Sequence, residues 1–209
     1  MPVPTIDGFK AEAARLGATG RVDIAVPGSM PVPVDMSPLG ETATNLGYIS
    51  DAGVTEPRDE DREEFVPWQE LTPIRSEITR SVASMSFVLW QSTIEANGFY
   101  YGFDKEDLML APDGSVVFDE KGKPTIKRHL LTLTVVDGTK ARRIIFPNCE
   151  VTTREEVVHS STEITALGVT VTAYPFGDEG LSVRRIWSEG WDTTGITGSI
   201  GGDTSPGGE

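Results

Sequence analysis

Side chains that could do chemistry are few in this sequence, and they are scattered. His129 and His159 are the only histidines, and neither stands at the spacing of a metal site. Cys149, the single cysteine, has no basic neighbours beyond Arg142 and Arg143, which predicts a small buried hydrophobic residue. There is no nucleophile elbow, phosphate-binding loop or dinucleotide fingerprint. We therefore expect no catalytic residue, metal ligand, cofactor or enzymatic activity.

Carboxylates are densest in residues 56–64. A calcium-binding loop would need alternating oxygen ligands, a central glycine and a terminal glutamate, and this run lacks that combination. A solvated loop is the better interpretation, after which Phe65, Val66 and Trp68 predict a return to apolar surface. Carboxylates are so abundant that a close pair would arise in any fold, which leaves glycosidase chemistry without a specific signal.

The composition limits the class of protein. Acidic residues outnumber basic ones by 32 to 18, and a surface with a net charge of −14 repels phosphate backbones and anionic membranes. The 22 glycines and 14 prolines favour many short strands over long helices. With one cysteine no intrachain disulfide forms, so we expect a reducing compartment during assembly, and we expect no signal peptide and no membrane span.

Alternation of polar and apolar residues marks the elements that would have to position a site. In residues 74–90, Met85, Phe87 and Leu89 alternate with Ser84 and Ser86, which predicts a strand with one buried face. Residues 163–174 alternate in the same way, with Thr170 and Thr172 opposite the valines. Between these strands, residues 91–101 suit a short helix ended by Gly102, and a further apolar strand is expected over residues 181–187.

Two Asp-Gly pairs predict hairpin turns. Asp113-Gly114 lies between two short apolar runs, and Asp137-Gly138 joins a strand over residues 126–136 to one over residues 140–146. Pro147-Asn148 is expected to break the second strand. Many antiparallel strands and one helix indicate a mainly β fold, with two packed antiparallel sheets in a β-sandwich or barrel-like arrangement and one short flanking helix.

Three parts of the chain are expected. Residues 1–20 form an N-terminal arm, with a helix over residues 5–17 that Phe9, Ala13 and Leu16 would line. Residues 21–192 form the β-domain, in which the Pro- and Gly-rich residues 27–40 make an extended arm or loop. Residues 193–209 form a flexible Gly-rich tail.

Residues 46–55 read locally as a turn, since Asp51 and Gly53 stand between β-forming residues. They also resemble a signature, LGYIS-x-x-GVT, near the start of major tail tube proteins of long-tailed, siphovirus-type bacteriophages, here of an actinobacterial host. The resemblance extends over residues 20–192 as an ordered set of segments. These are residues 22–27, 31–33, 37–40, Trp68, 84–90, 100–102, 145–147 and 169–175.

The resemblance implies a structural virion protein whose subunits form rings, usually hexameric, that stack into a tail tube. Such a tube holds the tape measure protein, ends at tail terminator and distal tail proteins, and conducts DNA without binding it specifically. It belongs to the virion tail and is assembled in the host cytoplasm without a membrane. An acidic lumen would repel the DNA phosphates.

Candidate surfaces follow from the strand pattern. Small hydroxyls on one strand face suit a wet lumen, although an outer wall fits the pattern equally well. The lumen candidates are Ser84, Ser86, Thr170 and Thr172. The loop candidates for contacts between rings are Pro31, Pro33, Asp59, Glu60, Asp61, Asp113 and Gly114. We hypothesise that the terminal arm, the loop near Pro31 and residues 56–64 become fixed only on assembly.

Two alternatives remain open. A monomeric β-sandwich that binds carbohydrate or protein would present an aromatic platform of Trp187, Trp191 and Tyr174, although these residues fit core packing as well. Another ring-forming tail component, such as a tail terminator, would share the composition.

Overall fold

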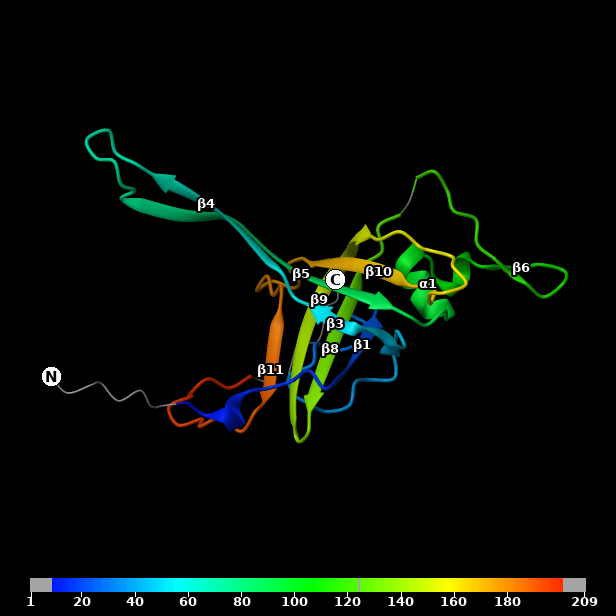
Figure 1. Cartoon of the computed structure of the whole chain (residues 1–209), viewed down its shortest axis with the longest axis horizontal. Coiled ribbons are helices and arrows are strands. Elements are labelled where there is room, and N and C mark those ends of the chain that lie inside the picture. The colour runs from blue at the N-terminus through cyan, green and yellow to red at the C-terminus, as the bar shows by residue number, and fades with distance from the viewer. Residues whose placement is uncertain (1–8, 124, 201–209) are drawn as a thin grey trace.

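A curled antiparallel sheet forms the body of the molecule (Figure 1). The computed structural model describes residues 9–123 and 125–200. Its elements in chain order are η1 Ala11–Ala13, β1 Thr19–Ala25, β2 Thr44–Asn45, β3 Ile49–Thr55, β4 Arg58–Phe65, β5 Arg75–Leu89, α1 Ile94–Tyr101, η2 Lys105–Asp107, β6 Met109–Leu110, β7 Val116–Val117, β8 His129–Asp137, β9 Lys140–Arg154, β10 Leu167–Ala173 and β11 Arg184–Ser188.

The strand order in the main sheet is β2-β1-β8-β9-β10-β5-β3, with β11 added to β9 and β4 added to β5. All pairings are antiparallel, and β6 and β7 form a separate small sheet. This arrangement confirms the expected mainly β, sandwich- or barrel-like fold with one short helix. No helix in the described part of the chain is long and apolar enough to cross a bilayer.

The main core lies on one face of the curled sheet, under α1. Met85, Phe87 and Leu89 are buried as their alternation predicted, and Val169 and Val171 stand opposite Phe87 and Met85 on β10. Phe99 of α1 stacks on Phe87 with ring centroids 6.1 Å apart. Thr93 caps the helix by accepting a hydrogen bond from the Ala96 backbone, and Gly102 ends it, as expected.

A second, smaller core covers the other face of β8 and β9. Leu130 and Ile145 are buried there against Ala25 and Val32, and Phe176, Leu181 and Ile186 add partly buried surface. Because both faces of β8 and β9 are covered, the centre of this hairpin is apolar on both sides, as strands buried on two faces are.

The β8–β9 hairpin turns at Gly138 and Thr139, since Asp137 is already paired with Lys140. The turn predicted at Asp137-Gly138 is thus displaced by one residue. Gly138 has a φ of +59°, and a positive φ at the first central residue alone is the mark of a type II′ turn. The second predicted hairpin, around Asp113-Gly114, joins β6 and β7.

Three strand predictions were wrong in detail. Strand β8 begins at His129 and not at residue 126. Pro147-Asn148 does not break β9, because the register shift between β8 and β9 places a bulge there, and a bulge tolerates a residue without an amide donor. Residues 50–53 are no hairpin turn: Ile49 and Val54 both pair with β5, opposite Leu89 and Phe87, so the segment is a bulge in one strand.

The predicted helix over residues 5–17 is also wrong where it can be assessed. Residues 9–17 contain only the three-residue turn η1, and Phe9 and Leu16 are exposed at 84% and 77%. A helix this short is marginal in water unless an apolar face packs against the body, and here that face does not. The rest of the predicted helix, residues 5–8, and residues 201–209 of the predicted tail lie outside the described residues.

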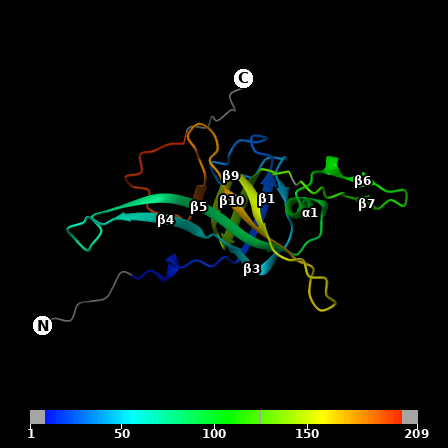
Figure 2. The ribbon, with the colours of Figure 1, turned by 90° about the horizontal axis from the view of Figure 1, so that it is seen from above.

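Residues 56–64 are not a loop. Most of them belong to β4, which pairs with the first half of β5 as a long two-stranded hairpin arm, here defined as residues 58–83 (Figures 1 and 2). All of β4 and residues 75–81 of β5 are exposed to solvent. The arm therefore extends away from the sheet without a layer to cover either of its faces.

Candidate functional site

The four predicted lumen residues lie together on the face of the sheet opposite the main core. Ser84 pairs with Thr172 and Ser86 with Thr170 across β5 and β10. The hydroxyls of Ser86 and Thr170 are 2.8 Å apart. Thr152 of β9, which was not predicted, joins them with its hydroxyl 2.9 Å from that of Thr172. We call Ser84, Ser86, Thr152, Thr170 and Thr172 the hydroxyl face.

Thr152 could not be placed from the sequence. A register shift between β9 and β10 at Thr170 and Val171 decides which β9 residue approaches Thr172. The sequence showed that Thr152 is a threonine in a strand, but it did not show which residues of the neighbouring strand lie opposite it. Ser84 is buried, and the other members that were predicted are half-buried, so most of this face meets solvent only in part.

The arm continues this face with acidic residues. Asp59 and Asp61 pair with Val82 and Arg80 of β5, which follow the same alternation as Ser84 and Ser86. Glu60 points to the other face, where it accepts hydrogen bonds from Arg58 (3.0 Å) and Arg62 (3.3 Å). These ion pairs are exposed, so they contribute little to stability.

A charged group borders the hydroxyl face at one end. Glu150 stands opposite Thr172 and accepts a hydrogen bond of 2.6 Å from the Tyr174 hydroxyl. Arg128 lies over the Tyr174 ring, 4.0 Å from its centroid, and pairs with Glu150 at 3.1 Å. The hydrogen bond to Glu150, followed by burial, raises the pKa of Tyr174. Tyr174 is thus engaged away from Trp187 and Trp191.

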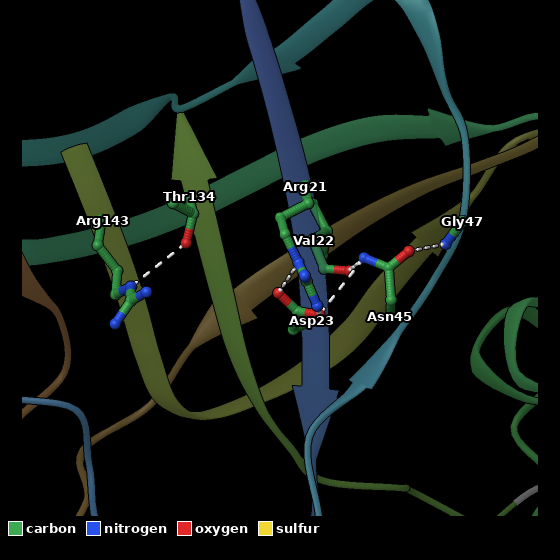
Figure 3. Close-up of polar contacts among 7 residues, drawn as sticks. All are labelled: Arg21, Val22, Asp23, Asn45, Gly47, Thr134 and Arg143. Carbon is green, nitrogen blue, oxygen red and sulfur yellow. Dashed lines mark hydrogen bonds and ion pairs between the residues drawn. The ribbon is translucent and has the colours of Figure 1, made fainter. Parts of the chain in front are cut away.

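The side chain of Asn45 anchors the start of residues 46–55 to β1 (Figure 3). The Asn45 amide donates to the Val22 carbonyl at 3.1 Å, and its oxygen accepts from the Gly47 backbone at 2.9 Å. Gly47 has a φ of +90°, and a Cβ there would lie 2.1 Å from the Gln91 amide oxygen. Gly47 is therefore required for two reasons: its φ is positive, and a larger side chain would clash with Gln91.

The loop of residues 27–40, with Pro31 and Pro33, is held against the sheet. The buried Arg143 guanidinium donates to the carbonyls of Asp35 (2.8 Å) and Ser37 (2.9 Å). Arg184 donates to the Val32 carbonyl at 3.2 Å. Figure 3 shows Arg143 reaching Thr134 on the neighbouring strand as well. Carbonyls of this loop are thus hydrogen-bonded to guanidinium groups of β9 and β11, which hold the loop against the sheet.

Asp113 and Gly114 lie at the turn between β6 and β7, at the end of the molecule remote from the arm (Figure 1). The Asp113 carboxylate accepts hydrogen bonds from the Ser115 backbone (3.0 Å) and hydroxyl (2.6 Å). Between α1 and this hairpin is an open hollow of about 470 Å³, here called the apolar hollow. It is lined mainly by apolar side chains: Ile94, Tyr101, Phe103, Leu108, Val116 and Phe118.

Glu189 joins three distant segments. Its side chain is buried and accepts hydrogen bonds from Arg15, at 2.6 Å, and from Arg142. These bonds, from Arg142 first and Arg15 second, lower the pKa of Glu189 below its usual 4.5. The contact fastens the segment before β1 and the segment after β11 to the β8–β9 hairpin.

Trp187 and Trp191 form an exposed pair. Their ring centroids are 5.4 Å apart at 33°, and the residues are 46% and 61% exposed. Core packing, the alternative considered for them, is therefore wrong. The aromatic platform predicted from Trp187, Trp191 and Tyr174 therefore consists of the two tryptophans alone, since Tyr174 contacts Arg128 and Glu150.

Of the two side chains with the most reactive chemistry, Cys149 is buried and His129 is half-buried. Burial lowers the pKa of His129 to about 4 and raises the pKa of the Cys149 thiol to about 12. The thiol donates to the His129 carbonyl at 3.3 Å, as a small core residue would. Within residues 9–123 and 125–200 no group of histidine, cysteine and acidic side chains is arranged to hold a metal ion.

Comparison with known proteins gives one family. The model of the family described as "Phage tail tube protein" matches residues 7–183. No curated protein matches the chain in sequence. Among solved structures, a chain of the 6-fold symmetrised cryo-EM structure of the anti-feeding prophage (AFP) baseplate is similar, with 6% identity and a TM-score of 0.40 over 89% of this chain and 97% of that chain. That likeness is too distant to support an argument.

Proposed function

Because the chain belongs to the phage tail tube protein family, we propose that it is the subunit of stacked, hexameric rings that make up the tube of a phage tail. The family is structural, so the chain is a virion component and not an enzyme. The family match over residues 7–183 is the observation that carries the proposal. The siphovirus type and the actinobacterial host rest on the likeness of residues 46–55 to the tail tube signature.

In the proposed tube the hydroxyl face lines the lumen. Its side chains bond to one another, as Ser86 does to Thr170 and Thr152 to Thr172, so few hydroxyls are left to hold a passing phosphate. The same face continues onto the arm with Asp59 and Asp61. Each subunit has a net charge of −14, so the tube repels DNA at short range. We propose that DNA passes this conduit without specific binding.

The proposed partners are those of a tube in a virion tail that is assembled in the host cytoplasm. They are further copies of this chain, the tape measure protein inside the tube, and terminator and distal tail proteins at its ends. The loop candidates are not equivalent for contacts between rings. Asp59, Glu60 and Asp61 stand on the exposed arm, whereas the loop of Pro31 and Pro33 is held by Arg143 and Arg184.

Negative-stain microscopy of the concentrated full-length protein, with its mass measured by light scattering, tests the proposal. We expect six-subunit rings and tubes built of them. Single rings that never stack would favour another ring-forming tail component. Monomers at every concentration would contradict the proposal.

The exposed Trp187–Trp191 pair favours a second candidate, a monomeric module that binds carbohydrate on an aromatic surface. A monomer whose tryptophan fluorescence changes with added oligosaccharide, and does not change in Trp191→Ala, would support that candidate over the tube.

A further inference from the structure

The loop at the end of the hairpin arm exposes apolar side chains almost completely. We call residues 65–74 the apolar tip. Trp68 is 98% exposed and Leu71 99%, and Phe65, Val66 and Ile74 are exposed at 41%, 55% and 68%. Exposed patches of this kind mark interaction sites, and tryptophan is among the side chains enriched in the residues that dominate binding.

The apolar tip is prepared for binding but uncovered in the single chain. The Ile74 backbone donates to the Phe65 carbonyl at 3.0 Å, which closes the loop, and Pro67 and Pro73 limit its conformations. A two-stranded hairpin without a third strand or a covering layer is marginal in water. A partner that covers the tip would therefore stabilise the arm and lose little entropy in ordering the loop.

The apolar hollow has the complementary character. Six apolar side chains line it together with the polar Ser92, Thr93, Asn97 and Glu120, and its volume of about 470 Å³ is within the range of about 300–1,000 Å³ for ligand pockets. Val116 and Ile94 on its wall are 55% and 43% exposed. Figures 1 and 2 place the arm and the α1–β6 region at opposite ends of the molecule, so the tip of a chain cannot reach its own hollow.

Charge favours a second copy of this chain as the occupant. Copies with a net charge of −14 repel one another, so they associate best through neutral surfaces. The tip contains one charged residue, Glu70, and the lining of the hollow also contains one, Glu120, so neither surface adds much to this repulsion. By contrast residues 58–64 of the arm contain five acids and two arginines, which protects its edge strand from pairing.

We propose that the apolar tip of one copy binds in the apolar hollow of the next copy, with Trp68 and Leu71 as the anchors. The contact is head to tail, because it joins two different surfaces of the same chain, and such contacts continue from copy to copy into a ring or an open helix. This inference rests on the proposed function as a self-assembling tube and specifies one contact within it.

Site-directed crosslinking tests the contact. Leu71→Cys and Val116→Cys are prepared as separate full-length proteins; the native Cys149 is buried with its pKa raised to about 12 and does not compete. A short bismaleimide should give dimers when the two variants are mixed, and none from either variant alone. The matched control replaces Val116→Cys by Asp178→Cys, on an exposed turn outside the hollow, and should give no dimer.

Assembly of Trp68→Ala and Trp191→Ala provides the second measurement. Both tryptophans are exposed, so both variants should melt like the parent. Trp68→Ala should raise the concentration needed for assembly about tenfold or more, the effect of losing an anchor residue, while Trp191→Ala should assemble like the parent.

The outcomes separate this inference from the proposed function. If the parent forms rings or tubes, but the mixed variants give no dimer and Trp68→Ala assembles normally, the inference is wrong and the proposed function stands. If the parent forms neither and the dimer still appears, the contact stands and the proposed tube does not. Dimers from Leu71→Cys alone would show tip-to-tip association and overturn the head-to-tail contact.

Discussion

Two neighbouring residues of β8 and β9, the half-buried His129 and the buried Cys149, have strongly shifted pKa values. His129 packs against Phe99, with ring centroids 5.0 Å apart, and its carbonyl accepts from the Cys149 thiol. Both side chains are held in their neutral forms by burial, which opposes charge in a poorly hydrated site. Neither performs chemistry, and each matters because charging it would destabilise the core.

Acid should therefore destabilise the protein through His129. Its pKa falls from 6.5 to about 4 on folding, mainly by burial, with Lys127 lowering it further and Asp104 opposing. The unfolded chain binds the proton first, so stability is complete above pH 6.5 and is lost as pH falls from 6.5 toward 4. At pH 5 the loss should be about 2 kcal/mol. His129→Phe should lack this loss in urea unfolding at pH 7.5 and pH 5.

The matched control for this experiment is His159→Asn, on an exposed loop, which should keep the full acid sensitivity. Equal sensitivity in His129→Phe and the parent would assign the acid response to other groups.

At the scale of elements, local patterns predicted what local interactions decide. The buried alternation in β5 and β10, the end of α1 at Gly102 and both hairpins, one of them displaced by one residue, followed from residues close in sequence. The helix predicted over residues 5–17 is the exception, and the errors in the strands came from pairing. Residues 50–53 look like a turn, but two segments of one strand pair with β5, and β4 is a strand because β5 extends beyond the body to meet it. Register and partner strands are long-range properties that one segment does not contain.

The β8–β9 turn offers a direct test of an element. Gly138 has a φ of +59°, and no atom lies within 4 Å of the position that a Cβ would take, so only backbone strain opposes a substitution there. Gly138→Val should cost about 1–3 kcal/mol and lower the melting temperature by several degrees. Gly122→Val, at an exposed glycine without a positive φ and with the same open space, is the control and should melt like the parent. An unchanged melt for Gly138→Val would refute the type II′ turn.

At the scale of the whole molecule, the surface is divided by chemical character. The hydroxyl face lies on the body, acidic residues follow β4, and apolar residues gather at the tip and in the hollow. The sequence predicted the hydroxyl face apart from Thr152, because the alternation in β5 and β10 is local. It did not predict the apolar tip, because Trp68 in sequence does not differ from a core residue until the arm is seen to leave the body.

The charge of the molecule predicts its behaviour toward nucleic acid. The subunit should show no measurable affinity for duplex DNA at physiological salt, measured by fluorescence anisotropy. The reason is the excess of 32 acidic over 18 basic residues. A micromolar affinity that weakens with salt would require a basic groove and would contradict a repulsive conduit.

Hydrogen exchange should distinguish the uncovered arm from the fixed loop. Amides of residues 56–74 should exchange fast in the monomer and slowly after assembly, because the arm is uncovered in the single chain. The β8–β9 hairpin should be protected in both states, and so should the loop near Pro31, which Arg143 and Arg184 hold. Equal protection of the arm in both states would mean that assembly does not cover it.

The ion pairs of Glu189 have a consequence for chain topology. Arg15 and Glu189 lie 174 residues apart in sequence and are in contact, so the ends of the domain meet at one place. A short linker between those two segments would close the chain into a circle without moving a strand. New ends opened at the exposed residues 122–123 should then give a circular permutant with the same sheet, which would show that the order of the strands in space does not depend on where translation begins.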